Sequence, residues 1–274
     1  MPTTILNKEF IATLIKRRDP HSHKGDHGHA LLIAGNTGRM GAAVLAARAC
    51  LRTGVGLLTV NVPKEERLIL QTAVPEAMLT MRSQEAMKKY NAVGIGPALG
   101  IEHDSRLLLQ SILSGSPTPL VVDADALTLL ANGDGTMANI PCGTIITPHV
   151  GEFDRLFGVC ANADVRSGKA LEMAATHSCI IVLKGSATLI ATNGHSYTNT
   201  TGNAGLAKGG SGDVLTGMIL ALLAQGYPSL DAACIGVYLH GLAADIAVKE
   251  ESMESLLATD VIAGIGKAFN FLRS

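Results

Sequence analysis

The sequence predicts an α/β protein, a three-layer αβα sandwich in which helices cover both faces of a mainly parallel β-sheet. Two observations favour this class. Short continuous apolar runs alternate with helical patterns over most of the chain, as expected for parallel strands that are covered on both faces. With 274 residues, of which 47% are hydrophobic, the chain is also long enough to bury a large core.

The predicted strands follow one another through the first two thirds of the chain. The first is Ala-Leu-Leu-Ile-Ala at residues 30–34, and the others lie at residues 57–60, 92–96, 120–123, 144–147 and 179–183. An alanine-rich helix is predicted at residues 41–52, a short one after Pro63, and another through Leu107, Leu108 and Ile112. This alternation implies right-handed crossovers between neighbouring strands.

The pattern changes after Lys184. Asn193-Gly194 lies between residues 187–191 and 197–200, and this dipeptide between two strand-like segments predicts a β-hairpin. The remaining predicted elements are helices at residues 212–225, 230–249 and 260–272. No Pro/Ser-rich linker, charge block or repeat divides the chain, so we expect a single domain over residues 1–274.

Composition excludes several classes of partner. The net charge is −1, charged residues make up 16%, and aromatic residues make up 3% with no Trp, so neither a basic footprint nor a base-stacking surface for nucleic acid is expected. Apolar runs such as residues 214–224 are too short to span a bilayer. The N-terminus has no signal-peptide layout, and five scattered cysteines without a Cys-x-x-Cys pair predict buried, reduced thiols in a cytoplasmic protein.

A glycine-dense loop from Thr201 to Gly212 leads into an apolar helical stretch. Glycines let the backbone approach a ligand closely, and the N–H groups of the loop and of the helix N-terminus attract an anion such as phosphate. Asp213 stands at the junction, where its charge repels a phosphate unless it takes a proton from a hydroxyl that attacks or loses that phosphate. The structural alternative is that Ser211 caps the helix and Asp213 complements its dipole.

Other candidate residues follow the predicted strands, where ligands of open α/β sheets bind. His149 either bonds a substrate or caps the next helix, and Lys184 either anchors a phosphate or is a surface lysine. Asp123 and Asp125 suit a magnesium ion or a hydroxyl, but helix capping explains them equally well. Glu152 and Asp154 fit the first turn of a helix as partners of its dipole.

Several familiar sites are not indicated. The chain does not contain the Gly-x-x-x-x-Gly-Lys-Ser/Thr pattern of nucleotide-binding P-loops. Its first glycine loop, Gly35-Asn36-Thr37-Gly38, lacks the Gly-x-Gly-x-x-Gly spacing of dinucleotide folds. Four histidines gather near the N-terminus, but no Cys or spaced carboxylate completes a metal site, so no metal-binding residue is predicted. These histidines are His21, His23, His27 and His29.

Taken together, the motifs resemble those of the NAD(P)H-hydrate dehydratase family of the ribokinase-like superfamily. The matching segments run in order over nearly the whole chain: residues 23–29 (His-Lys-Gly-Asp-His-Gly-His), 41–47, 52–57, 94–100, 122–127, 147–153 (Thr-Pro-His-Val-Gly-Glu-Phe), 182–185 and 202–213. Each motif alone is weak, whereas the ordered combination is specific. The departures are Val150, where the bacterial pattern often has Pro, and Ala98, where Gly is common.

The resemblance implies a ribokinase-like fold and a role in metabolite repair, in which hydrated NADH or NADPH (the S-epimer) loses water at the expense of ADP or ATP. It also implies that Ala42 or Ala43, Gly100, His149 and Asp213 face the hydrate. The residues that it places at the adenine nucleotide are Lys184, Gly185, Ser186, Ala187, Thr188, Gly209, Gly210, Ser211 and Gly212. Relatives suggest Mg²⁺ as the counterion of the nucleotide and a homotetramer as the assembly.

In the mechanism that this resemblance implies, Asp213 removes the proton of the hydrate's C6 hydroxyl, which then attacks the terminal phosphorus. Phosphate leaves afterwards and NAD(P)H forms. Two alternatives remain at this point. One is a small-molecule kinase of the same superfamily, of the hydroxyethylthiazole or pyridoxal type, and the other is a non-catalytic nucleotide sensor, in which a carboxylate beside phosphates has no use.

Overall fold

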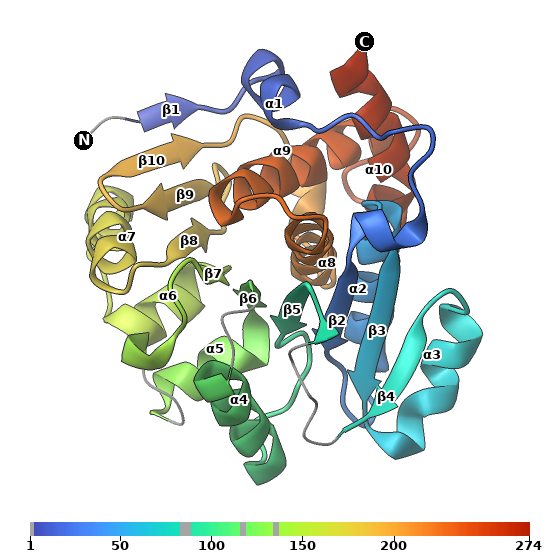
Figure 1. Ribbon diagram of the computed structural model, residues 1–274. Coiled ribbons are helices and arrows are strands. Elements are labelled where there is room, and N and C mark those ends of the chain that lie inside the picture. Colours follow the sequence, from blue (N-terminus) through green and yellow to red (C-terminus); the bar gives the residue numbers. More distant parts are fainter. Residues whose placement is uncertain (1–2, 83–88, 116–118, 134–136) are drawn as a thin grey trace.

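A single ten-stranded sheet organises the chain (Figure 1). The computed structural model describes residues 3–82, 89–115, 119–133 and 137–274. Within them the strand order is β1-β10-β9-β8-β7-β6-β5-β2-β3-β4, and all neighbours are parallel except β8–β9 and β9–β10. The strands are β1 (Thr3–Ile5), β2 (His29–Ile33), β3 (Leu57–Val62), β4 (Met78–Met81), β5 (Ala92–Ile95), β6 (Leu120–Val122), β7 (Ile145–Ile146), β8 (Ile180–Leu183), β9 (Leu189–Thr192) and β10 (His195–Thr198).

Helices cover both faces of this sheet, as predicted. One face carries α1 (Lys8–Leu14), α2 (Met40–Arg52), α3 (Arg67–Ala73), α8 (Ser211–Ala224), α9 (Ser229–Ala247) and α10 (Ala258–Arg273). The other carries α4 (His103–Gly115), α5 (Ala124–Ala131), α6 (Val150–Phe157) and α7 (Ala163–Thr176). Successive residues of β2 serve opposite cores, because Leu32 packs with the α2–α8 layer and Leu31 with the α4–α7 layer.

The sequence prediction is confirmed for the central strands and for the hairpin. Asn193-Gly194 forms the two-residue turn between β9 and β10, with Thr192 paired to His195 and Gly194 at a φ of 75°. The prediction missed β1, β4, α1 and α7. The two missed strands lie at the edges of the sheet, and most of their residues are half-buried or exposed, so they lack the apolar run that identifies a central strand.

Two further predictions need correction. By length and composition α9 is apolar enough to cross a membrane, but 72% of its apolar window is buried inside the protein, where the helix packs against α8 and α10. Four of the five cysteine thiols are free and buried as predicted, whereas Cys142 is free and exposed.

Close packing of α8 on α2 fixes the position of α8. Every residue from Val214 to Ala224 is buried, and a β-carbon built on Gly217 would lie 2.1 Å from the carbonyl oxygen of Ala46. A glycine is therefore required where the two helix backbones meet.

The substitution Gly217→Ala is expected to lower the free energy of unfolding by about 1–3 kcal/mol, because the added methyl group must push α2 away from α8. Gly168 in α7 is the matched control, since it is exposed and a β-carbon there meets nothing within 4 Å. Gly168→Ala is expected to be neutral or to stabilise the protein by up to about 1 kcal/mol through helix propensity. Urea unfolding of both variants measures the difference, and equal stabilities would contradict the packing argument.

Candidate active site

The predicted site residues meet at one edge of the sheet. Strands β2 to β8 are parallel neighbours, so their carboxyl ends lie along the same edge. His149 follows β7 and Lys184 follows β8, and the two residues form a parallel β-bridge in which the Lys184 N–H donates to the Pro148 carbonyl at 2.8 Å. Asp123 follows β6 between the ends of these strands and β5.

The N-terminus of α8 opens onto this edge without a side-chain cap. Gly210 is the N-cap, with the positive φ of 94°, and Ser211 is already the first helical residue. The prediction that Ser211 caps the helix is therefore wrong, because the chain enters α8 through a left-handed residue that suits only glycine. Since no side chain satisfies the first N–H groups of α8, they are available to an anion.

Asp213 lies in this first turn and is half-buried. The pKa of its carboxyl is raised to about 7, chiefly by burial and next by the neighbouring Asp123 charge, while Lys184 opposes both effects. Asp125 also raises it. No side chain among the described residues donates a hydrogen bond to the Asp213 carboxylate, so it is free to accept a proton from a ligand near neutral pH.

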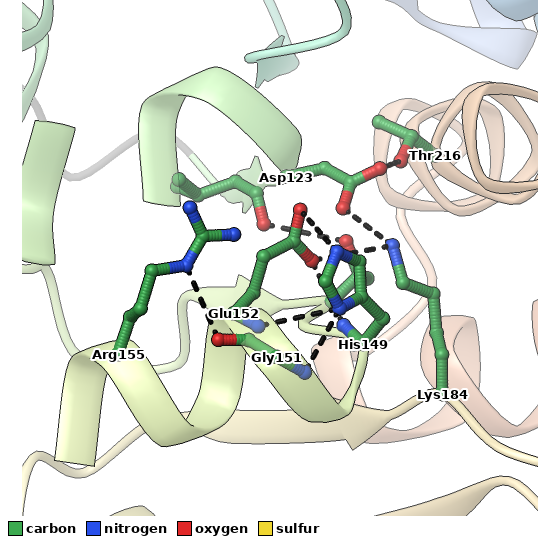
Figure 2. Close-up of polar contacts among 9 residues, drawn as sticks. Asp123, His149, Gly151, Glu152, Arg155, Lys184 and Thr216 are labelled. Carbon is green, nitrogen blue, oxygen red and sulfur yellow. Dashed lines mark hydrogen bonds and ion pairs between the residues drawn. The ribbon is translucent and has the colours of Figure 1, made fainter. Parts of the chain in front are cut away.

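Lys184 is not a surface lysine but the cation of a buried ion pair (Figure 2). Its Nζ donates to Asp123 Oδ1 at 2.8 Å and lies 3.9 Å from Glu152 Oε2. A β-carbon on Gly212 would lie 3.3 Å from the same nitrogen, so the ammonium stands beside the N-terminus of α8. Burial lowers the pKa of Lys184, but the carboxylates outweigh it and the net shift is upward, which keeps the group charged.

His149 caps α6, as one of its two interpretations predicted. Its Nδ1 accepts the N–H groups of Gly151 at 3.0 Å and Glu152 at 3.2 Å, which caps α6 (Figure 2). Glu152 completes a capping box by accepting the His149 N–H at 2.8 Å. Since Nδ1 accepts, the neutral ring carries its proton on Nε2, which lies 3.4 Å from Glu152 Oε1. The side chain is 54% exposed, so this edge of the ring is accessible to a ligand.

The other residues assigned to the hydrate lie nearby on the same edge of the sheet. Of the alternatives Ala42 and Ala43, only Ala42 keeps exposed surface, because Ala43 is fully buried against Gly35. The N–H of Gly100 donates to Asp125 Oδ2 at 2.8 Å. Asp125 thus holds the loop after β5, rather than capping α5 as one prediction had it.

The segment assigned to the nucleotide continues from Lys184 toward β9. Gly185, Ser186 and Ala187 are exposed, and Thr188 is half-buried with its hydroxyl 3.5 Å from the Gly185 carbonyl. Gly209 is also exposed, just before the N-cap of α8. These residues offer backbone groups rather than charges, and Lys184 supplies the cation beside them.

No protein metal cage is found in the described part of the chain, where no group of three or more His, Cys, Asp or Glu side chains is placed to hold an ion. The N-terminal histidines bond local partners instead. His27 Nε2 lies 2.9 Å from Ser22 Oγ, and His29 Nε2 lies 2.8 Å from Thr59 Oγ1.

Sequence reasoning missed the partners that hold this site together. Asp123 is 1% exposed and joins Lys184 to the Thr216 hydroxyl, which donates to Asp123 Oδ2 at 2.7 Å. It was expected to bind magnesium or to cap a helix, but it makes no side-chain cap bond to α5. Glu152 lies between His149 and Lys184 and does more than complement a helix dipole. Asp154 is paired with Arg166 through two contacts of 2.9 Å.

Comparison with known proteins gives a consistent result. A model of the NAD(P)H-hydrate dehydratase family matches residues 30–267. The chain is 38% identical to the bifunctional NAD(P)H-hydrate repair enzyme Nnr of Escherichia coli K12 over 96% of its own length, and it spans about half (51%) of that protein. It is 35% identical to the ADP-dependent (S)-NAD(P)H-hydrate dehydratase of Bacillus subtilis 168, covering 96% of this chain and 97% of the relative.

Solved structures agree with these relatives. The crystal structure of the ADP/ATP-dependent NAD(P)H-hydrate dehydratase from Bacillus subtilis, co-crystallised with ATP/Mg²⁺, superposes with a TM-score of 0.90 at 33% identity and 98% coverage of both chains. A ribokinase-like superfamily protein from Enterococcus faecalis V583 gives a TM-score of 0.89 at 28% identity, covering 98% of this chain and 96% of that one. The ribokinase-like fold predicted from the sequence is confirmed.

The raised pKa of Asp213 makes a prediction about stability. Because the folded-state pKa (about 7) lies above that of an unfolded chain, about 3.9, the folded protein loses stability as the pH rises from about 4 to about 7. Asp213→Asn removes this cost. It is expected to raise the free energy of unfolding little at pH 4 and by about 2 kcal/mol at pH 8, after allowance for solvent screening.

Urea unfolding at the two pH values measures this effect. Asp154→Asn is the control, because Arg166 holds the pKa of Asp154 below its usual range, chiefly through a side-chain hydrogen bond. Loss of that carboxylate is expected to destabilise the protein at pH 8. If Asp213→Asn is no more stable than the parent at pH 8, ionisation of the Asp213 carboxyl does not cost the folded protein stability.

Proposed function

The chain belongs to the NAD(P)H-hydrate dehydratase family, and we propose that it converts the S-epimers of hydrated NADH and NADPH back to NADH and NADPH, driven by phosphoryl transfer from ADP. The observation that carries this proposal is the position of Asp213. A carboxylate with its pKa raised to about 7 stands in the uncapped first turn of α8, beside the ammonium of Lys184. A binding site for phosphate alone gains nothing from that carboxylate.

The proposed reaction begins at the C6 hydroxyl of the hydrate. Asp213 accepts the hydroxyl proton while the oxygen forms a bond to the terminal phosphorus of ADP, and the bond from that phosphorus to the bridging oxygen breaks to release AMP. The C6–O bond of the phosphorylated intermediate then breaks, pushed by the lone pair of the ring nitrogen. Inorganic phosphate departs, and loss of a proton from C5 restores the double bond.

In this proposal, different residues at the carboxyl edge of the sheet stabilise charge, bind the nucleotide and bind the hydrate. The N–H groups of Ser211 and Gly212 and the ammonium of Lys184 face the place where charge develops on the transferred phosphoryl group. The exposed loop at residues 185–188 accommodates the nucleotide, and the Nε2–H of His149 donates to the hydrate. Each group is fixed before the substrates bind, which lowers the cost of reorganisation in the transition state.

Magnesium enters this proposal with the nucleotide. Because the described residues form no three-ligand cage, phosphate oxygens and waters would hold the ion, as is usual for Mg²⁺ with nucleotides. Its charge would neutralise the phosphates beside Asp213. A homotetramer in the cytoplasm is part of the same proposal, and light scattering of the purified protein measures the assembly.

The first test is a direct assay of the hydrate with ADP or ATP and Mg²⁺. We expect free phosphate and reduced-nicotinamide absorbance to appear in equal amounts, with ADP the better donor. Asp213→Asn is expected to lower turnover by about 10²–10⁴-fold, the usual contribution of a general base, while nucleotide affinity holds or improves because a like charge is removed.

Two outcomes of this assay would sink the proposal. One is an untouched hydrate together with phosphorylation of a thiazole or pyridoxal alcohol, which would identify a kinase. The other is near-normal turnover by folded Asp213→Asn, which would remove the base from the mechanism. A higher rate with ATP than with ADP would overturn only the choice of donor.

The two roles of His149 can be separated by substitution. His149→Ala is expected to weaken hydrate use by about 1–3 kcal/mol in kcat/KM through loss of a hydrogen bond, and to lower the stability by about 1 kcal/mol through loss of the α6 cap. His149→Asn keeps a capping side chain and is expected to restore stability but not hydrate use. Recovery of both together would show that His149 only caps the helix.

A further inference from the structure

Asp123 is the most completely fixed charged group at the sheet edge. Its side chain is 2% exposed, and its two oxygens are occupied by Lys184 Nζ at 2.8 Å and by the Thr216 hydroxyl at 2.7 Å. Its backbone N–H donates to the Ile95 carbonyl at 3.0 Å. The following residue, Ala124, has a φ of 50°, a strained conformation for a residue with a β-carbon. The chain therefore holds this carboxylate in place at a conformational cost.

The fixed carboxylate lies against the first turn of α8. A β-carbon on Gly212 would lie 3.7 Å from Asp123 Oδ2 and 3.3 Å from Lys184 Nζ, and Thr216 is one turn further along the same helix. Asp123 thus faces the part of α8 that carries Asp213. Two like charges close together in a partly buried site disfavour each other's ionisation.

We propose that Asp123 is a positioning residue that makes Asp213 a stronger base: its fixed charge opposes ionisation of Asp213, and its pairing with Lys184 limits how far the ammonium offsets that charge. The proposal rests on the proposed function, in which Asp213 removes the hydroxyl proton. It assigns to Asp123 an electrostatic role that neither helix capping nor metal binding supplies.

Other charged and titratable groups surround Asp213 on the elements packed against it. From α5, Asp125 adds negative charge, although Arg39 at the start of α2 lies 3.4 Å from its Oδ2 and offsets part of it. From α9, His240 lies beneath Ser211, and burial lowers its pKa to about 4, so it is neutral. Lys184 alone opposes the carboxylates. Asp123 is the neighbouring charge with the largest effect on the pKa of Asp213.

A magnesium ligand is the main alternative for Asp123. Both of its oxygens already accept hydrogen bonds, and an ammonium occupies the space in front of Oδ1. A cation would have to displace Lys184 from a buried pair, which is costly. The second alternative is that Asp123 and Lys184 form a purely structural ion pair. In that case, replacing Asp123 leaves the pKa of Asp213 unchanged, which a titration can detect.

The experiment is an NMR titration of ¹³C-labelled aspartate carboxyls in the substrate-free protein, with the Asp213 resonance assigned by its loss in Asp213→Asn. In Asp123→Asn, the pKa of Asp213 is expected to fall by about one unit. The acid limb of the pH profile of kcat/KM is expected to move by the same amount, and the plateau kcat to fall severalfold because the base is weaker.

Asp154→Asn is the matched control, since it removes a half of another well-ordered ion pair, 2.9 Å from Arg166, away from this site. It is expected to lower stability but to leave both the Asp213 titration and the pH profile unchanged. An Asp213 pKa in Asp123→Asn that equals that of the parent protein would overturn the proposal, as would equal shifts in both variants.

Two further variants keep the proposal testable if Asp123→Asn does not fold. Lys184→Gln is expected to raise the pKa of Asp213, because the opposing cation is lost, and Asp125→Asn to lower it by less than Asp123→Asn would. Absence of the rise in Lys184→Gln would contradict the proposed balance of charges. The titration needs no hydrate, so a failure of the proposed activity and a failure of this inference are read separately.

Discussion

The burial of α8 is the constraint on which the site depends. An apolar helix enclosed between the sheet and the helices α2, α9 and α10 has no freedom to slide or rotate, because its residues from Val214 to Ala224 are all buried and Gly217 touches the backbone of α2. Its N-terminus is therefore fixed at the carboxyl edge of the sheet. The uncapped N–H groups, Asp213 and the contact between Thr216 and Asp123 all take their positions from that single placement.

Charge balance explains how a carboxylate can stand where an anion must bind. Asp123 and Glu152 lie beside the Lys184 ammonium, and among the described residues Lys184 is the charge that lowers the pKa of Asp213. The N–H groups of α8 add positive potential without adding a titratable group. Asp123 and Asp125 are held by Lys184, Thr216, Arg39 and the Gly100 N–H, whereas the pKa of Asp213 is raised to about 7. In the proposed reaction, the charge of the Mg²⁺ that accompanies the nucleotide would offset the Asp213 carboxylate.

Local sequence patterns predicted much of the fold, and they correctly predicted that the candidate site lies at the carboxyl edge of the sheet. Apolar runs identified the central strands because their residues are buried on both faces, and Asn193-Gly194 identified the hairpin because the turn chemistry is local. The partners within the site lie far apart in the sequence, and no spacing rule joins Asp123 to Lys184 or to Thr216. The cap of α8 was predicted at Ser211 but lies one residue earlier, because the chain enters the helix through the left-handed Gly210. Ala98 has a φ of 48°, a left-handed conformation that favours glycine.

At the end of β7, the cap of α6 and the candidate site share two residues, His149 and Glu152. His149 uses Nδ1 to begin α6 and presents Nε2 to the site, while Glu152 closes the capping box and lies beside Lys184. A substitution of His149 or Glu152 that changes the candidate site therefore also changes the cap of α6. Asp213 differs, because ionisation of its carboxyl disfavours the folded state. A carboxylate whose ionisation costs stability is the pattern expected of a residue that serves reactivity, whereas a helix cap contributes to stability.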